Sequence, residues 1–157
     1  MREIVLTQGK VALVDDEDFE LVSQWKWHAH FDGLHWYARR GQRVNGKVVI
    51  TRMRRQLLCP QEGKDIDHIS GDTLDNRRCN LREATKAENV RNQPPRCNRT
   101  SGVQHKGVYV EGDSFRAQIR YHSVLISLGT WSTEFDAACA YDAAAEWLFG
   151  EFSNTNF

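Results

Sequence analysis

The segment from residue 66 to residue 89 contains side chains that could together hydrolyse a phosphodiester. Asp67 and His68 stand side by side in it, and Asn80 and Asn89 follow. An imidazole changes charge near neutral pH and can accept a proton from water, and Mg²⁺ and Mn²⁺ take carboxylate and amide oxygens as ligands. These residue types therefore fit a metal-assisted attack of water on phosphorus.

Two strands and a helix must position these residues. The Asp-His pair ends the first predicted strand, a polar loop follows, and Asn80-Leu81 opens the second strand. Thr85 and Glu88 have the spacing of a capping box, which predicts that a helix starts here and carries Asn89 in its first turn. The predicted order is strand, strand, helix.

Residues 66–89 resemble the HNH motif, which folds as two strands and a helix around a metal ion. The resemblance implies that His68 is the general base and that Asp67 and Asn89 hold the metal. It gives Asn80 the role of bracing the hairpin through side-chain hydrogen bonds. The expected ion is Mg²⁺ or Mn²⁺, and zinc is not expected, because the last motif residue is asparagine rather than histidine and no cysteine pair has zinc spacing.

One position departs from the proteins that this segment resembles. They often carry a His-Arg pair in the helix just upstream, where this chain has Arg54 and Arg55. Arg55 keeps the expected phosphate contact, and the effect of Arg54 on activity stays open.

Basic side chains gather in inner segments of a neutral chain. The sequence has 21 basic and 21 acidic side chains, but residues 39–58 hold seven basic and no acidic ones. Such a stripe suits a phosphate backbone, which is bound through release of counterions. We take four arginines as candidate phosphate contacts: Arg54, Arg55, Arg77 and Arg78. A solvated basic face is the alternative explanation.

The first 60 residues are predicted to be rich in short strands. Apolar or alternating runs predict strands at 4–6, 11–14, 25–30, 35–40 and 47–51, with turn signals at Asp32-Gly33 and Asn45-Gly46. Two helices are predicted, over 15–24 and over 52–58, the second stopping before Pro60. What this region contacts is not indicated by the sequence.

A linker separates the chemistry-bearing segment from the C-terminal part. Residues 94–105 begin with two prolines followed by small polar residues, which cannot continue a helix. Strands are predicted at 108–110, 115–121 and 124–128, and an alanine-rich helix is predicted to start after Thr133 and to end at Gly150. Alternation in the middle strand predicts one face against the helix and one polar, basic face.

Residues 106–157 resemble the plant APETALA-type DNA-binding domain, through Gly107-Val108, Ile119-Arg120, Leu128-Gly129-Thr130-Trp131 and Ala140-Tyr141-Asp142-Ala143-Ala144. In that domain the free face of the sheet lies in the major groove, where Arg and Gln read base edges. The resemblance implies DNA contacts from five residues: Lys106, Tyr109, Arg116, Gln118 and Arg120. Leu125 and Ser127 replace contact residues of the plant proteins, so their target sequence does not carry over. The alternative is that these five residues only keep the surface of the sheet soluble and do not contact DNA.

The sequence as a whole predicts an α+β protein. We expect a strand-rich region at 1–60, a ββα-metal nuclease at 61–93, a linker at 94–105 and a three-stranded antiparallel sheet packed on one helix at 106–157. The arrangement resembles homing endonucleases of phages and mobile elements.

The expected function is metal-dependent nicking of double-stranded DNA. A non-enzymatic DNA-binding regulator and a phage nuclease with little site preference are the alternatives. No apolar run is long enough to cross a bilayer, and no signal peptide is evident. We therefore expect no membrane partner and a place in the cytoplasm of a bacterial or phage-infected cell. The sequence does not indicate the oligomeric state, and a monomer is the default.

Overall fold

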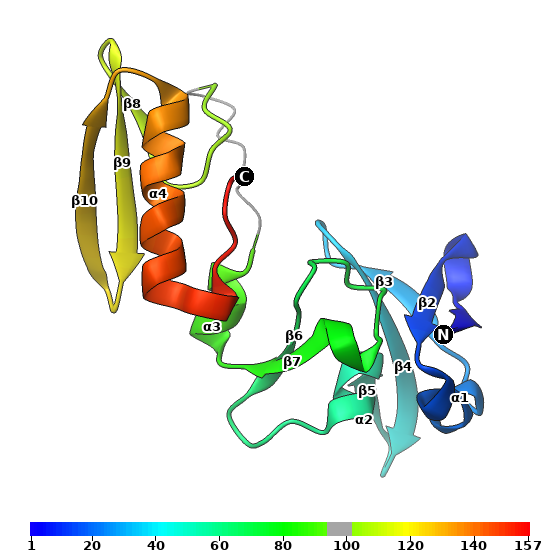
Figure 1. Cartoon of the computed structure of the whole chain (residues 1–157). Coiled ribbons are helices and arrows are strands. Elements are labelled where there is room, and N and C mark those ends of the chain that lie inside the picture. The colour runs from blue at the N-terminus through cyan, green and yellow to red at the C-terminus, as the bar shows by residue number, and fades with distance from the viewer. Residues whose placement is uncertain (94–101) are drawn as a thin grey trace. The chain divides into compact units, whose positions relative to one another are not determined.

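The computed structural model describes residues 1–93 and 102–157. They form two compact units, residues 1–86 and residues 87–157 (Figure 1). Most of the linker predicted at 94–105 lies outside the described residues. The chain is a mixture of helices and several small sheets, as an α+β sequence predicts.

The first unit contains short strands and helices. Its strands are β1 (Arg2–Val5), β2 (Val11–Val14), β3 (His28–Phe31), β4 (Trp36–Val44), β5 (Lys47–Arg52), β6 (Asp65–His68) and β7 (Leu81–Ala84). Its helical segments are the 3-10 turn η1 (Thr7–Gly9), α1 (Asp16–Ser23), α2 (Met53–Leu58) and the 3-10 turn η2 (Arg78–Asn80). The strands pair in antiparallel order as β1-β2, β3-β4-β5 and β6-β7.

Several predicted strands have different bounds in the structure: the strand expected over 4–6 lies at 2–5, the one expected over 124–128 runs on to 131, and two others have an evident cause. The strand expected over 25–30 begins only at His28, because Trp27 turns into the core and its indole nitrogen donates to the carbonyl of Val22 at 2.9 Å. The strand expected over 35–40 runs on to Val44, because its second half pairs with β5. The packing of Trp27 thus sets the first of these ends, and pairing with β5 sets the second.

One hydrophobic core joins the first 60 residues to the hairpin β6-β7. Val14 and Trp27 pack in the same cluster as Met53 of α2, Ile66 of β6 and Leu81 of β7. Burial of such side chains stabilises the fold by about 1.5–3 kcal/mol each. The N-terminal strands therefore form the support on which the hairpin rests.

The second unit is a sheet with a helix against it. Its elements are α3 (Lys86–Arg91, with Lys86 still in the first unit), β8 (Val108–Glu111), β9 (Ser114–Tyr121), β10 (Val124–Trp131), α4 (Glu134–Phe149) and the 3-10 turn η3 (Gly150–Phe152). The sheet is antiparallel in the order β10-β9-β8, and α4 lies along it (Figure 1). The three-stranded sheet and single long helix predicted here are therefore observed.

Small side chains let α4 approach the sheet closely. Ala117 and Ile119 of β9 are buried against Ala137, Ala138 and Tyr141 of α4. The helix begins where the sequence predicts, because the Thr133 hydroxyl accepts a hydrogen bond from the Asp136 amide at 3.1 Å. The side chains of Arg116, Gln118 and Arg120 lie on the opposite face of β9.

Candidate active site

The hairpin β6-β7 carries Asp67 and His68 at its loop end. Asp67 pairs across the hairpin with Arg82, and His68 pairs with Leu81. Both residues are buried: counted over the whole residue, 7% of Asp67 and 3% of His68 is exposed. The structure thus brings the two chemistry-bearing residues together in a site that largely excludes water.

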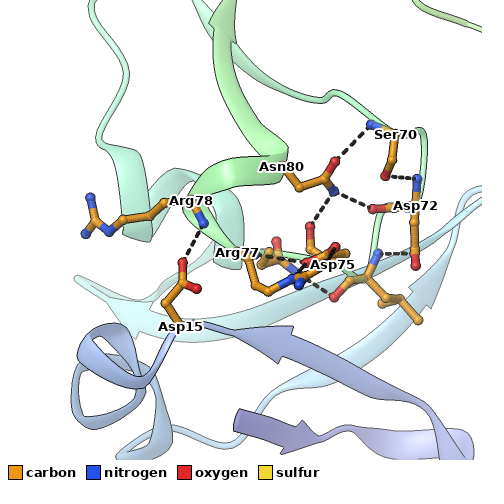
Figure 2. A network of polar contacts seen from close by, with 9 residues as sticks. Asp15, Ser70, Asp72, Asp75, Arg77, Arg78 and Asn80 are labelled. Carbon is orange, nitrogen blue, oxygen red and sulfur yellow. Dashed lines mark hydrogen bonds and ion pairs between the residues drawn. The ribbon is translucent and has the colours of Figure 1, made fainter. Parts of the chain in front are cut away.

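The loop that follows His68 is held by Asn80 (Figure 2). The Asn80 side-chain oxygen accepts from the Ser70 amide at 2.8 Å, and its nitrogen donates to the carbonyls of Asp75 at 2.8 Å and Asp72 at 3.3 Å. A backbone bond from the Ile69 amide to the Asn80 carbonyl closes the same loop at 2.8 Å. These contacts fit the bracing role that the sequence suggested.

Asn76 orients the imidazole of His68. The Asn76 side-chain nitrogen donates to the Leu74 carbonyl at 3.0 Å, so its oxygen faces Nε2 of His68 at 3.4 Å. Because an amide oxygen only accepts, this contact favours the tautomer with the proton on Nε2, in which Nδ1 is the nitrogen that can accept a proton.

The surroundings of His68 keep the imidazole neutral. Burial and, next, the positive charge of Arg54 lower the pKa of His68 to about 4, and the contact with Asn76 opposes this only in part. At neutral pH the imidazole is therefore unprotonated and able to accept a proton.

Asp67 is the carboxylate that could hold a metal ion. Arg82 donates to its Oδ2 from Nε at 3.0 Å and from Nη2 at 2.8 Å. Within the part of the chain that the structure describes, Oδ1 receives no hydrogen bond, so one hard oxygen remains for Mg²⁺. No three His, Cys, Asp or Glu side chains of residues 1–93 and 102–157 gather as a metal cluster. Asn89 lies in α3, in the second unit.

Arg77 and Arg78 each pair with a carboxylate of the first unit. Arg77 donates to both oxygens of Asp75, at 2.8 and 2.6 Å, and this contact lowers the pKa of Asp75. Arg78 donates to both oxygens of buried Asp18, at 2.8 and 2.7 Å. Its amide also donates to Asp15 at 2.7 Å (Figure 2). The contacts of Arg78 tie the loop to α1, whereas Arg77 and Asp75 pair within the loop. A phosphate contact from either arginine stays a prediction.

Arg54 and Arg55 share the carboxylate of Asp65. Arg54 donates to Oδ2 at 3.1 Å and Arg55 to Oδ1 at 3.2 Å. Arg54 is the more buried, and its guanidinium lies 5.3 Å from the ring centre of Tyr37. Burial lowers the pKa of Arg54. The residue that stands where a histidine was expected thus packs against Tyr37, and its positive charge lowers the pKa of His68.

The predicted DNA-contacting residues of the second unit differ in accessibility. Arg116, Arg120 and Tyr109 are exposed, and Gln118 is half-buried. Lys106 is engaged inside the unit, because its ammonium donates to the carbonyls of Arg91 and Gln93, both at 2.7 Å. Burial lowers the pKa of Lys106. Its contact with DNA stays a prediction, and the structure shows that it also ties the end of α3 to the sheet.

Sequence inspection missed two residues of the site. Asn76 lies in a polar loop without a motif of its own, and Tyr37 comes from β4, more than twenty residues before the hairpin. The Asn76 amide and the Tyr37 ring come close to His68 only because the chain folds. The ring centres of Tyr37 and His68 are 6.5 Å apart. No pattern in the sequence marks either residue.

Comparison with known proteins agrees with this site. Residues 59–91 match the family described as HNH endonuclease, a segment that spans β6, the loop, β7 and α3. The chain is 29% identical over 158 residues to an uncharacterized HNH endonuclease of Acanthamoeba polyphaga mimivirus, covering 95% of this chain and 76% of the relative. No solved structure matches the chain. The protein is therefore a nuclease, an enzyme whose residues 59–91 are similar to HNH endonucleases.

Proposed function

We propose that the protein is a metal-dependent endonuclease that nicks double-stranded DNA, guided by its C-terminal unit. The observation that carries the proposal is the pair Asp67 and His68, buried side by side at the end of β6. A neutral imidazole beside a carboxylate is what hydrolysis of a phosphodiester by activated water requires.

The metal would be Mg²⁺ or Mn²⁺, held by Asp67 and Asn89. Two protein ligands of this kind leave most positions of the ion to water and to DNA phosphate, which is usual for Mg²⁺. The ion would stabilise charge at phosphorus and on the leaving oxygen. His68 would take the proton from water, and Asn80 would keep the loop in place.

The second unit would guide the enzyme to its site on DNA. Arg116, Gln118 and Arg120 alternate along the face of β9 that is turned away from α4. Arginine and glutamine can pair with guanine and adenine edges in the major groove. We propose that this face reads bases, and that the protein works as a monomer in the cytoplasm of its host cell. None of the helices that the structure describes is long and apolar enough to cross a membrane.

A plasmid assay tests the proposal. Supercoiled DNA is incubated with the protein in MgCl₂, in MnCl₂ and in EDTA, and nicked circles are expected only with the metals. His68→Asn should abolish nicking while DNA affinity stays near that of the wild type, because the base acts in the transition state and not in binding. His122→Asn is the matched control: it lies in the turn between β9 and β10, where φ is 43° and asparagine is tolerated.

Each outcome of this assay decides one part of the proposal. Linear DNA as the first product would contradict nicking by a single site. Nicking by His68→Asn would remove His68 as the base. A wild-type protein that binds DNA but never cuts it would instead support a non-enzymatic regulator.

A further inference from the structure

The sheet β3-β4-β5 carries a polar cavity beside the site described above, and Tyr37 and Arg54 belong to both. Its volume is about 260 Å³, and its lining includes His30, Tyr37, Arg39, Arg52 and Arg54. All of these residues belong to the first unit. The cavity therefore has a lining rich in cations and hydrogen-bond donors.

Strand register explains why these side chains share one face. His30 is the cross-strand partner of Tyr37, and Arg39 is the partner of Arg52. Alternate residues of a strand point to opposite faces, and Ala29 and Ala38 are buried in the core beneath. The other face is therefore left to the aromatic and basic residues.

Three arginines line the cavity, Arg39, Arg52 and Arg54, and the carboxylate in its lining is that of Asp32. Arg39 forms no ion pair or hydrogen bond through its side chain with any residue that the structure describes. It stands directly opposite Arg52, and like charges in this position destabilise a sheet. Arg52 reaches only Asp65, at 3.7 Å, and shares that carboxylate with Arg54 and another arginine.

Arg54 gives a second reason to place an anion in the cavity. Its side chain is only 11% exposed, and its Nε is buried without a hydrogen-bond partner among the described residues. A buried donor left unpaired costs about 1–3 kcal/mol. An anion in the cavity would offset both this cost and the repulsion between Arg39 and Arg52.

The cavity lies next to the imidazole that we propose as the base. Tyr37 lines the cavity, and its ring centre is 6.5 Å from that of His68. Arg54 lines it too, and its guanidinium lies 5.3 Å from the ring centre of Tyr37. A ligand here would therefore be held beside the reacting group.

We propose that this cavity binds one phosphodiester of the DNA strand, a neighbour of the one that is cut, with Arg39 and Arg52 as its main contacts. The inference rests on the proposed function. Guanidinium groups pair with phosphate oxygens in two parallel hydrogen bonds, so two opposed arginines can hold a phosphate in a defined place. That contact would fix which neighbouring bond lies at His68.

A phosphate-replacement experiment tests the cavity. After the nick has been mapped, duplexes are made with one neutral methylphosphonate at each linkage around it, and single-turnover nicking rates are measured. In the wild type, one position should lower the rate about ten-fold, the usual size of a lost charged hydrogen bond. Arg39→Gln should lower the rate on native DNA about as much and be insensitive to replacement at that same position.

Arg43→Gln is the matched control, because it changes the same residue type further along β4, outside the cavity. Its nicking rate should still fall, as that of the wild type does, when the methylphosphonate stands at the one critical linkage. If Arg39→Gln and Arg43→Gln lose rate equally and both keep that sensitivity, general surface charge explains the result and the cavity proposal is wrong. Arg52→Gln repeats the test from the partner strand in case Arg39→Gln does not fold.

Binding separates this proposal from the proposed function. Duplexes that carry one methylphosphonate at each linkage in turn, designed without reference to a nick, are titrated with His68→Asn, with and without Arg39→Gln, so that no cleavage is needed. One methylphosphonate position should weaken binding only while Arg39 is present. If no methylphosphonate position weakens binding in this Arg39-dependent way while the wild type nicks DNA, the cavity proposal is wrong and the proposed function stands. If the dependence is present and the wild type never nicks, the proposed function fails alone.

Discussion

Arg82 donates two hydrogen bonds to a single carboxylate oxygen of Asp67, its cross-strand partner in the hairpin β6-β7. Little of either side chain is exposed: 11% of the Arg82 side chain and 9% of the Asp67 side chain. A guanidinium in this position competes with a cation for the charge of the carboxylate that we propose as metal ligand.

The first prediction follows from this pair. Arg82→Gln should lower the melting temperature in EDTA by about 5 °C or more, because it leaves a buried carboxylate without its partner. Adding Mg²⁺ should raise the melting temperature more in the variant than in the wild type, since a cation can replace the lost charge. Differential scanning calorimetry measures both shifts. Equal shifts in the two proteins would contradict a metal at Asp67, and Asp67→Asn in the Arg82→Gln background should remove the Mg²⁺ effect.

The second prediction separates a brace from a metal ligand. Asn80→Ala removes three side-chain hydrogen bonds in a buried loop and should lower both stability and nicking, at a cost of about 1–3 kcal/mol. Asn89→Ala should lower nicking without changing the melting temperature of the first unit, and excess Mn²⁺ should partly restore it. An unchanged melting temperature in Asn80→Ala would rule out the bracing role.

The third prediction concerns Arg78, which the sequence alone suggested as a phosphate contact. Its pair with buried Asp18 predicts that Arg78→Ala lowers the melting temperature of the first unit by several degrees. Arg43→Ala, an exposed arginine of the same unit, is the control and should leave it unchanged. If stability is unaffected and the salt dependence of DNA binding falls instead, Arg78 acts on phosphate.

The fourth prediction tests the close approach of α4 to the sheet. At Gly107, where φ is 74°, a Cβ would lie 2.0 Å from Cδ2 of Tyr141. Gly107→Ala should therefore destabilise the second unit strongly. At Gly112 φ is 61° but nothing lies within 4 Å of the added carbon, so Gly112→Ala should cost only the backbone strain. Hydrogen exchange of α4 amides compares the two variants, and equal protection would show that packing at Tyr141 contributes little.

The fifth prediction tests base reading by the second unit. Arg120 is exposed on the free face of β9, and a paired guanine would add about 1–3 kcal/mol of discrimination. Arg120→Ala should therefore reduce cutting at the preferred site more than at random DNA, whereas Arg55→Ala should weaken both alike. Selection of cleaved sites from randomised duplexes provides the comparison. An unchanged site preference in Arg120→Ala would show that this sheet does not read bases.

Local patterns in the sequence predicted much of the secondary structure and the central residues of the site. The capping signal at Thr133 and the alternation around Ala117 depend on neighbours a few residues away, so α4 and β9 appear as expected. The adjacency of Asp67 and His68 is covalent, and the spacing to Asn80 fits one hairpin loop. These features need no information from distant parts of the chain.

Only the tertiary structure decided what surrounds those residues. Asn76 and Tyr37 meet His68, and Arg82 meets Asp67, because pairing and core packing bring separate segments together. The pairing register likewise sets Arg39 against Arg52 across two strands, where the sequence showed only a basic run. The sequence by itself thus determined which groups can do chemistry. Their burial, charge partners and orientation depend on contacts between residues far apart in the chain, which short-range patterns do not encode.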